Sequence, residues 1–115
     1  MRYIVLDTET TGLDPDDGHK IIEIGCIEIF NRNVTNNTFH KYINPEREID
    51  IEASKVHGLT YNNLKDKPLF KDIYQEFLTY IGDAPLIIHN APFDIGFLKK
   101  EYSLMNEKKD FLKND

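Results

Sequence analysis

An apolar run near the N-terminus ends in two carboxylates at alternate positions, and this arrangement constrains the fold more than any other feature of the sequence. Residues 3–6 are Tyr-Ile-Val-Leu, and Asp7 and Glu9 follow on either side of β-branched Thr8. The run predicts a buried strand over residues 2–8, and side chains alternate across a strand. Asp7 and Glu9 are therefore expected on one face of a sheet.

Two carboxylates this close on a low-dielectric element repel each other unless one is protonated or a cation lies between them. Oxygen ligands without Cys or His favour Mg²⁺ or Mn²⁺ over Zn²⁺. For an isolated Asp-x-Glu pair, two solvated acids at a strand end are the simpler interpretation. The surrounding motifs decide between these two possibilities.

Composition predicts one soluble, globular domain of 115 residues, with 40% hydrophobic and 30% charged residues. The net charge of −6 argues against a broad basic nucleic-acid surface, whereas a metal-dependent nuclease needs only local positive charge. No apolar run is long enough to cross a bilayer and no signal region opens the chain, so we expect a cytoplasmic location and no membrane contact. The single cysteine, Cys26, is expected to be a buried thiol.

Periodicity predicts a mixed α/β architecture. After the first strand and a turn over 13–19, we expect strands over 20–30 and 34–43 joined by a hairpin, a short helix over 52–57, a helix from Pro68 to about Ile81, a strand over 85–89 and a helix from Pro92 to about Met105. The first and last strands are expected to pair in parallel, because a long connection containing a helix separates them.

That pairing brings the carboxyl ends of both strands to one sheet edge, where Asp7 and Glu9 would face the first turn of the last helix. Asp94 lies in that turn, on roughly the side of Phe97, although Glu101 also falls there. An acid that complements the helix dipole is the alternative interpretation of Asp94.

Three motifs follow one another in a specific order. They are D-T-E-T-T-G at 7–12, G-H-K-I-I-E-I-G at 18–25 and H-N-A-P-F-D-I-G-F-L at 89–98, with E-A-S-K-V-H-G-L-T at 52–60 and D-K-P-L-F at 66–70 between them. From Arg2 to about Met105 the chain resembles the DEDD family of 3′-to-5′ exonucleases, in particular the proofreading subunits of bacterial replicative polymerases. The resemblance implies a ribonuclease H-like α/β fold, with three antiparallel strands, a fourth parallel to the first, and flanking helices.

The sequence departs from the family pattern at its C-terminal end. Family members carry a third motif, a histidine five positions before a last aspartate, and no such motif follows residue 98 here. His89 and Asp94 have that spacing, but assigning them to the third motif would leave no second one. Residues 1–115 are therefore expected to be the N-terminal part of one exonuclease domain, weak or inactive alone, without the general base and the fourth carboxylate.

The three acids Asp7, Glu9 and Asp94 are the expected catalytic residues and metal ligands. Together at one sheet edge they would hold two divalent ions, Mg²⁺ or Mn²⁺, for phosphodiester hydrolysis. Asp7 would bridge the ions, Glu9 would complete the site of the ion that activates water, and Asp94 would hold the second ion directly or through water.

The resemblance also implies six contacts to the terminal nucleotide: Thr8, Thr10, Glu52, His57, Asn90 and Phe93. A carboxylate such as Glu52 can accept the terminal 3′ hydroxyl, and a ring such as Phe93 can support a base. As alternatives, His57 ends a helix and Phe93 belongs to the core. His89 is expected to be a strand-end histidine hydrogen-bonded inside the protein, and His19 and His40 to be solvated surface residues.

The function that these features predict is a 3′-to-5′ exonuclease on single-stranded or frayed DNA ends, which proofreads for a replicative polymerase. Its partners would be DNA 3′ ends, the polymerase catalytic subunit and other replicase subunits. One alternative is an exonuclease of the same family that trims RNA or short oligonucleotides, and another is a non-catalytic fragment that docks on a polymerase.

A bare apolar surface is expected on the C-terminal third of the chain, which would favour self-association of the fragment. The candidates are Phe93, Phe97, Leu98, Phe111 and Leu112.

Overall fold

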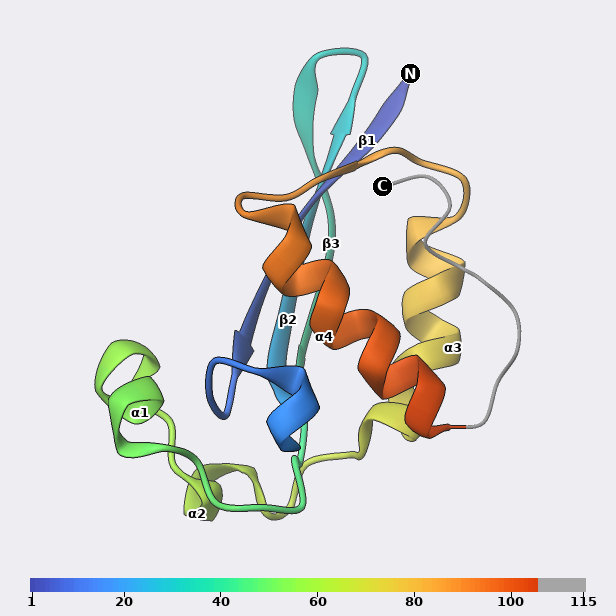
Figure 1. Cartoon of the computed structure of the whole chain (residues 1–115). Helices are drawn as coiled ribbons and strands as arrows, with labels where there is room; N and C mark the ends of the chain where they lie inside the picture. The colour runs from blue at the N-terminus through green and yellow to red at the C-terminus, as the bar shows by residue number, and fades with distance from the viewer. Residues whose placement is uncertain (106–115) are drawn as a thin grey trace.

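A four-stranded mixed sheet forms the centre of the computed structural model, which describes residues 1–105 (Figure 1). In chain order the elements are β1 (Arg2–Thr10), a 3₁₀ turn η1 (Pro15–Asp17), β2 (Ile21–Phe30), β3 (Asn33–Tyr42), α1 (Ile51–His57), α2 (Tyr61–Leu64), α3 (Phe70–Ile81), β4 (Leu86–Ile87) and α4 (Ala91–Leu104). The sheet order is β3-β2-β1-β4. β1 and β2, and β2 and β3, are antiparallel, while β1 and β4 are parallel, as the sequence predicts.

The hairpin between β2 and β3 is closed by a two-residue turn. Phe30 pairs with Asn33, and both residues between them have positive φ, 50° at Asn31 and 71° at Arg32. Positive φ at both central positions defines the turn whose twist matches that of paired strands, and asparagine tolerates it better than most residues. The turn fixes the register in which β3 begins to pair with β2.

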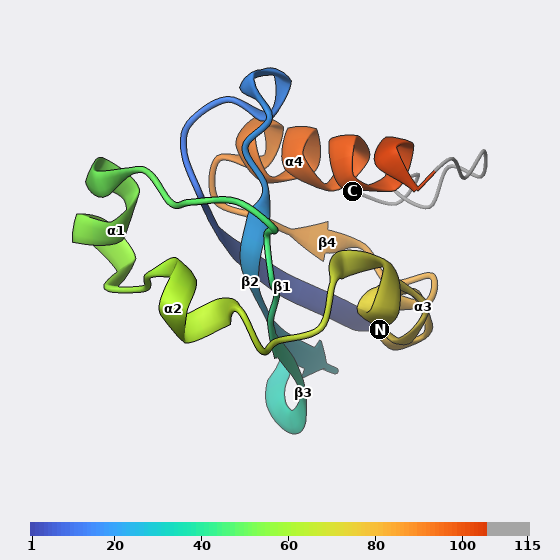
Figure 2. The same cartoon turned by 90° about the horizontal axis from the view of Figure 1, so that it is seen from below.

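One face of the sheet is covered by α3 and α4. Side chains from even positions of β1, such as Ile4 and Leu6, share a buried cluster with Phe77 of α3 and Phe97 of α4. Figures 1 and 2 show α4 crossing this face, with α3 and α1 at opposite ends of the molecule. Cys26 belongs to the same cluster, and burial raises the pKa of its thiol to about 12, which agrees with the predicted inert thiol.

The opposite face of the sheet is open within residues 1–105. Val5 pairs with Ile27 on β2 and with Ile87 on β4, so the three side chains share this face. Ile27 is 45% exposed and Ile87 is 46% exposed. Ile27 and Ile87, with Val5 between them, therefore form an apolar row on the open face of the sheet.

Two of the residues predicted to form an exposed apolar surface on the C-terminal third are not exposed. Phe97 and Leu98 are fully buried, because α4 turns them toward the sheet, and Phe93 is half-buried. Phe111 and Leu112 lie outside the described residues.

Arg2 joins the start of β1 to the end of α3. Its guanidinium donates to the backbone oxygens of Tyr80 (2.6 Å) and Ile81 (3.0 Å) and pairs with Glu28 on β2. The hydrogen bond from Arg2 holds the pKa of the Glu28 carboxyl below its usual value. A cation at the C-terminus of a helix complements its dipole, so Arg2 fixes α3 on the sheet.

Strand β4 is shorter than predicted, with two residues in place of five. Pro85 has no N–H to give to a ladder, although its oxygen accepts a hydrogen bond from Ile4 N at 3.1 Å. Asn90 adopts a left-handed conformation (φ 56°) that ends the extended segment and starts α4. No helix among residues 1–105 is both long enough and apolar enough to span a bilayer.

Candidate active site

At the carboxyl end of β1, acidic side chains and hydroxyl side chains lie on opposite faces of the sheet. Thr8 and Thr10 are each 6% exposed and point to the covered face, while Asp7 and Glu9 alternate with them on the open face. Asp7 is exposed and lines a shallow hollow of about 310 Å³ over β2 and β3. The shared face of the two acids is the one that the strand pattern predicts.

Two of the acids at this edge, Glu9 and Asp94, have a raised pKa. Burial raises the pKa of Glu9 most, and the negative charge of Asp7 adds to it. Glu23, directly opposite Glu9 on β2, contributes in the same direction. Burial also raises the pKa of Asp94, with a further contribution from Asp7. Accumulated negative charge at one strand end is a setting that a bound cation would stabilise.

Asp94 lies in the first turn of α4, behind β1. It is 3% exposed, and its Oδ1 accepts a hydrogen bond from Thr8 Oγ1 at 2.5 Å. That bond opposes the effect of burial on the pKa of Asp94. Asp94 therefore contacts the threonine between the two acids, on the covered side of the strand.

Among residues 1–105, no three His, Cys, Asp or Glu side chains form a group close enough to hold one metal ion. The all-oxygen donors and the raised pKa values of Glu9 and Asp94 nevertheless fit a hard divalent cation, with Asp7 exposed, Glu9 half-buried and Asp94 behind them.

A larger pocket opens beside the acids, at the end of β1. This β1-end pocket has a volume of about 420 Å³ and brings Glu9 together with every predicted substrate contact except Asn90. Its lining residues are Thr8, Glu9, Thr10, Gly12, Leu13, Asp50, Glu52, Ala53, Val56, His57 and Phe93. They come from β1 and its following turn, from α1 and from α4, three segments far apart in sequence.

Two large, exposed apolar residues of the pocket were not predicted. Leu13 is 85% exposed and Val56 is 81% exposed, so neither belongs to the core. Together with half-buried Phe93 they give the pocket an apolar rim suited to a flat ring. Leu13 directly follows the D-T-E-T-T-G motif, and Val56 lies inside the E-A-S-K-V-H-G-L-T motif. These positions are the only sequence signal that could have found them.

His57 uses both ring nitrogens within the protein. Its Nδ1 accepts from Leu59 N at 3.0 Å, and its Nε2 lies 3.1 Å from the backbone oxygen of Thr10. Since a carbonyl oxygen only accepts, Nε2 carries the ring hydrogen. His57 thus joins the end of α1 to the end of β1, in addition to lining the pocket.

Two sequence-based expectations about histidines need correction. His89 is exposed, since the extended segment ends before it, whereas we expected it inside. His19 is 11% exposed and contacts Thr11 and Asp50, so it is not a solvated surface residue. Asn90 is exposed and starts α4. Glu101 shares the inner side of α4 because its carboxylate accepts from Ile21 N at 2.9 Å.

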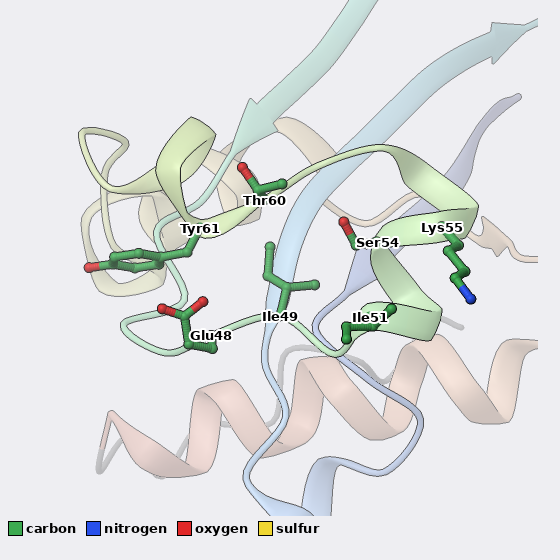
Figure 3. Close-up of a pocket in the computed structure, with 7 residues that line it drawn as sticks. All are labelled: Glu48, Ile49, Ile51, Ser54, Lys55, Thr60 and Tyr61. Atoms are coloured by element: carbon green, nitrogen blue, oxygen red, sulfur yellow. The ribbon is translucent and has the colours of Figure 1, made fainter.

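A second cavity, of about 330 Å³, lies between α1 and α2 (Figure 3). Ile49 is central among its labelled side chains, and Tyr61 and Lys55 lie at opposite ends. It contains none of the predicted catalytic or substrate-binding residues. The β1-end pocket is therefore the candidate active site.

Comparison with known proteins shows the family of the chain. The exonuclease family model RNase_T matches residues 4–113. The chain belongs to this family. DNA polymerase III subunit epsilon of Rickettsia prowazekii is 60% identical over 105 residues, which cover 91% of this chain and 46% of that protein. The chain thus spans about half the length of the curated relatives it matches.

Two solved structures support the ribonuclease H-like fold. Exonuclease X, in complex with 5′ overhanging duplex DNA, is 28% identical with a TM-score of 0.70, over 83% of this chain and 52% of that one. Cell-death related nuclease 4 is 16% identical with a TM-score of 0.79, over 94% and 41%. Members of this exonuclease family are metal-dependent.

Proposed function

We propose that the full-length protein is a metal-dependent 3′-to-5′ exonuclease that removes nucleotides from single-stranded or frayed DNA ends and proofreads for a replicative polymerase. The observation that carries this proposal is the β1-end pocket, where an acidic strand end meets an apolar rim. The polymerase catalytic subunit and other replicase subunits are the proposed partners, since the relatives are named as polymerase subunits. The proposed location is the cytoplasm.

In the proposed complex, the terminal base packs among Leu13, Val56 and Phe93. Glu52 is exposed on α1 and accepts the terminal 3′ hydroxyl, while the scissile phosphate lies toward Glu9. His57 and Thr10 hold α1 and β1 together beneath the sugar.

Asp7, Glu9 and Asp94 would hold the divalent cations, two Mg²⁺ or Mn²⁺ ions in our proposal. When bound, the ions would supply the chemistry of activating a water and stabilising the departing oxygen. Thr8 keeps the Asp94 carboxylate in place.

The test uses the full-length protein and a 5′-labelled single-stranded DNA oligonucleotide with Mg²⁺ or Mn²⁺. We expect stepwise shortening from the 3′ end, and a fall of at least about 10³-fold in Asp7→Ala. Asp83→Ala, at an exposed acid between α3 and β4, is the matched control and should keep wild-type activity. Mn²⁺ should raise the melting temperature of wild type but not of Asp7→Ala.

Equal activity of Asp7→Ala and wild type would refute the proposed site. Faster degradation of an RNA oligonucleotide of the same sequence would favour an RNA-trimming enzyme. Absence of any nuclease activity in the full-length protein, with binding to a polymerase retained, would favour a docking module.

A further inference from the structure

Helix α1 forms one side of the β1-end pocket without being packed into the core. None of its seven residues is buried, and Ile51 and Val56 are 73% and 81% exposed. The β1-end pocket lies along one side of the helix and the cavity in Figure 3 along another. Apolar packing therefore contributes little to the position of α1, and polar contacts at its two ends must fix it.

The N-terminal end of α1 is attached through Asp50. Its backbone N–H donates to Thr11 O at 2.9 Å. An aspartate at this position usually caps the helix with its side chain, but the Asp50 carboxylate makes no capping hydrogen bond. One of its oxygens instead lies 3.3 Å from Nε2 of His19. The start of α1 is thus attached to His19 rather than to its own first turn.

His19 is itself anchored by a buried threonine. Thr11 is fully buried, and its Oγ1 accepts from Lys20 N at 3.0 Å and lies 2.8 Å from Nδ1 of His19. With the ring hydrogen on Nε2, the Thr11 hydroxyl donates to Nδ1, and Nε2 lies near the Asp50 carboxylate. This chain of contacts runs from the start of β2 to the start of α1.

The imidazole also lies directly on Gly12. A Cβ at Gly12 would come within 2.3–2.5 Å of three ring atoms, so the ring occupies the space of a side chain at that position. Gly12 and Asp50 both line the β1-end pocket, whereas His19 does not. His19 therefore contacts two sides of the pocket from behind.

We propose that His19 is a positioning residue that sets the distance between the Gly12 turn and α1, and thereby the fit of the pocket to the 3′-terminal nucleotide. This inference rests on the proposed function, because it names the residue that shapes the proposed nucleotide pocket. The contact to Asp50 is the decisive one, since it links the two sides.

Two substitutions separate the contacts of His19. Glutamine can reach Asp50 with an amide N–H near the place of Nε2, whereas asparagine can replace only Nδ1 toward Thr11. In the full-length protein, His19→Ala and His19→Asn should lower kcat/KM on a single-stranded DNA oligonucleotide by about 10-fold to 10²-fold, mainly through KM, and His19→Gln should recover most of it. Asn44→Ala is the matched control: Asn44 joins two loops outside the pocket through Lys65 O and Glu46 N, so its loss should leave KM unchanged.

A double-mutant cycle provides a second measurement. Gly12→Ala alone should raise KM by displacing the ring, and it should add nothing to His19→Ala, where the ring is absent. The proposal is overturned if the three His19 variants keep the wild-type KM, if asparagine and glutamine behave alike, or if the Gly12 and His19 effects add independently. Activity retained in Asp7→Ala would instead overturn the proposed function.

Discussion

Two helices bring side chains to the same end of β1, and they are held in place by different forces. α4 buries Ile95, Phe97 and Leu98 in the core, whereas α1 buries no residue and is attached through hydrogen bonds at its ends. Because of this difference in packing, the two helices have different roles in the β1-end pocket. α4 supplies a rigid side that carries Phe93 and Asp94, and α1 supplies a side that can adjust without unfolding the core.

Thr8 and Thr10 follow each other on the covered face of β1, and each contacts one of the two helices through a different atom. Thr8 contacts α4 through its hydroxyl, which donates to Asp94, whereas Thr10 contacts α1 through its backbone oxygen, which accepts from His57. A substitution of the threonine side chain can therefore disturb the α4 contact while leaving the α1 contact in place.

The largest expected difference is in amide hydrogen exchange. Amides of α4 should exchange only through global unfolding, which costs about 5–15 kcal/mol in a typical domain. Those of α1 should exchange through local opening, at least about 10³-fold faster. Exchange followed by NMR or mass spectrometry measures both helices at once. Equal protection of Val56 and Leu98 amides would show that α1 is part of the cooperative core.

Removal of a large side chain from each helix gives the next largest effect. Phe97→Ala should lower the free energy of unfolding by about 3–5 kcal/mol, because it leaves a cavity in a fully buried site. Val56→Ala on α1 is the matched control and should change it by no more than about 0.5 kcal/mol. Urea unfolding measures both variants, and a comparable loss in both would contradict the distinction between the two helices.

The sequence predicts α4 because a helix depends on local periodicity, and it predicts the parallel pairing of β1 with β4 because a long connection containing a helix separates them. Phe97 and Leu98 fit a helix spacing, but spacing alone does not say which side the sheet covers, and our expectation that they are exposed was wrong. The burial of Glu101 likewise depends on its contact with Ile21, which is 80 residues away in the chain.

The β1-end pocket could be predicted only in part. Strand alternation pointed to Glu9, the family resemblance pointed to Glu52 and His57, and the pocket contains all three. The role of His19 depends on a close approach to Gly12 and on a carboxylate that leaves its usual capping position. Neither feature has a signature in a single sequence, because an isolated histidine in a turn is most often solvated.

Thr8→Val tests the hydrogen bond that joins α4 to β1. Valine keeps the shape of threonine but leaves buried Asp94 Oδ1 without its donor, so the free energy of unfolding should fall by about 1–3 kcal/mol. Thr10→Val is the matched control on the same face. It removes a bond between neutral groups, from Thr10 Oγ1 to Gly12 O, and should cost about 0.5–1.5 kcal/mol. A larger loss in Thr10→Val would mean that Asp94 finds another donor.

The smallest expected effect is a change in the pH dependence of stability. It tests whether ionisation of the buried Glu101 carboxylate on α4 lowers the stability of the folded state. Burial raises the pKa of Glu101 above its ordinary value of 4.5, although Lys20 and Ile21 N oppose the shift. The folded state therefore binds more protons than the unfolded state above pH 4.5. This contribution to stability is complete below pH 4.5 and is lost as the pH rises through the folded-state pKa.

Glu101→Gln cannot titrate, so its stability should fall less than that of wild type between pH 4.5 and 7, as measured by urea unfolding at a series of pH values. Glu9 and Asp94, whose pKa values are also raised, are unchanged in the variant and act equally on both curves. Parallel curves would show that Glu101 ionises as easily in the core as in water, and that its bonds to Ile21 and Lys20 fully offset its burial.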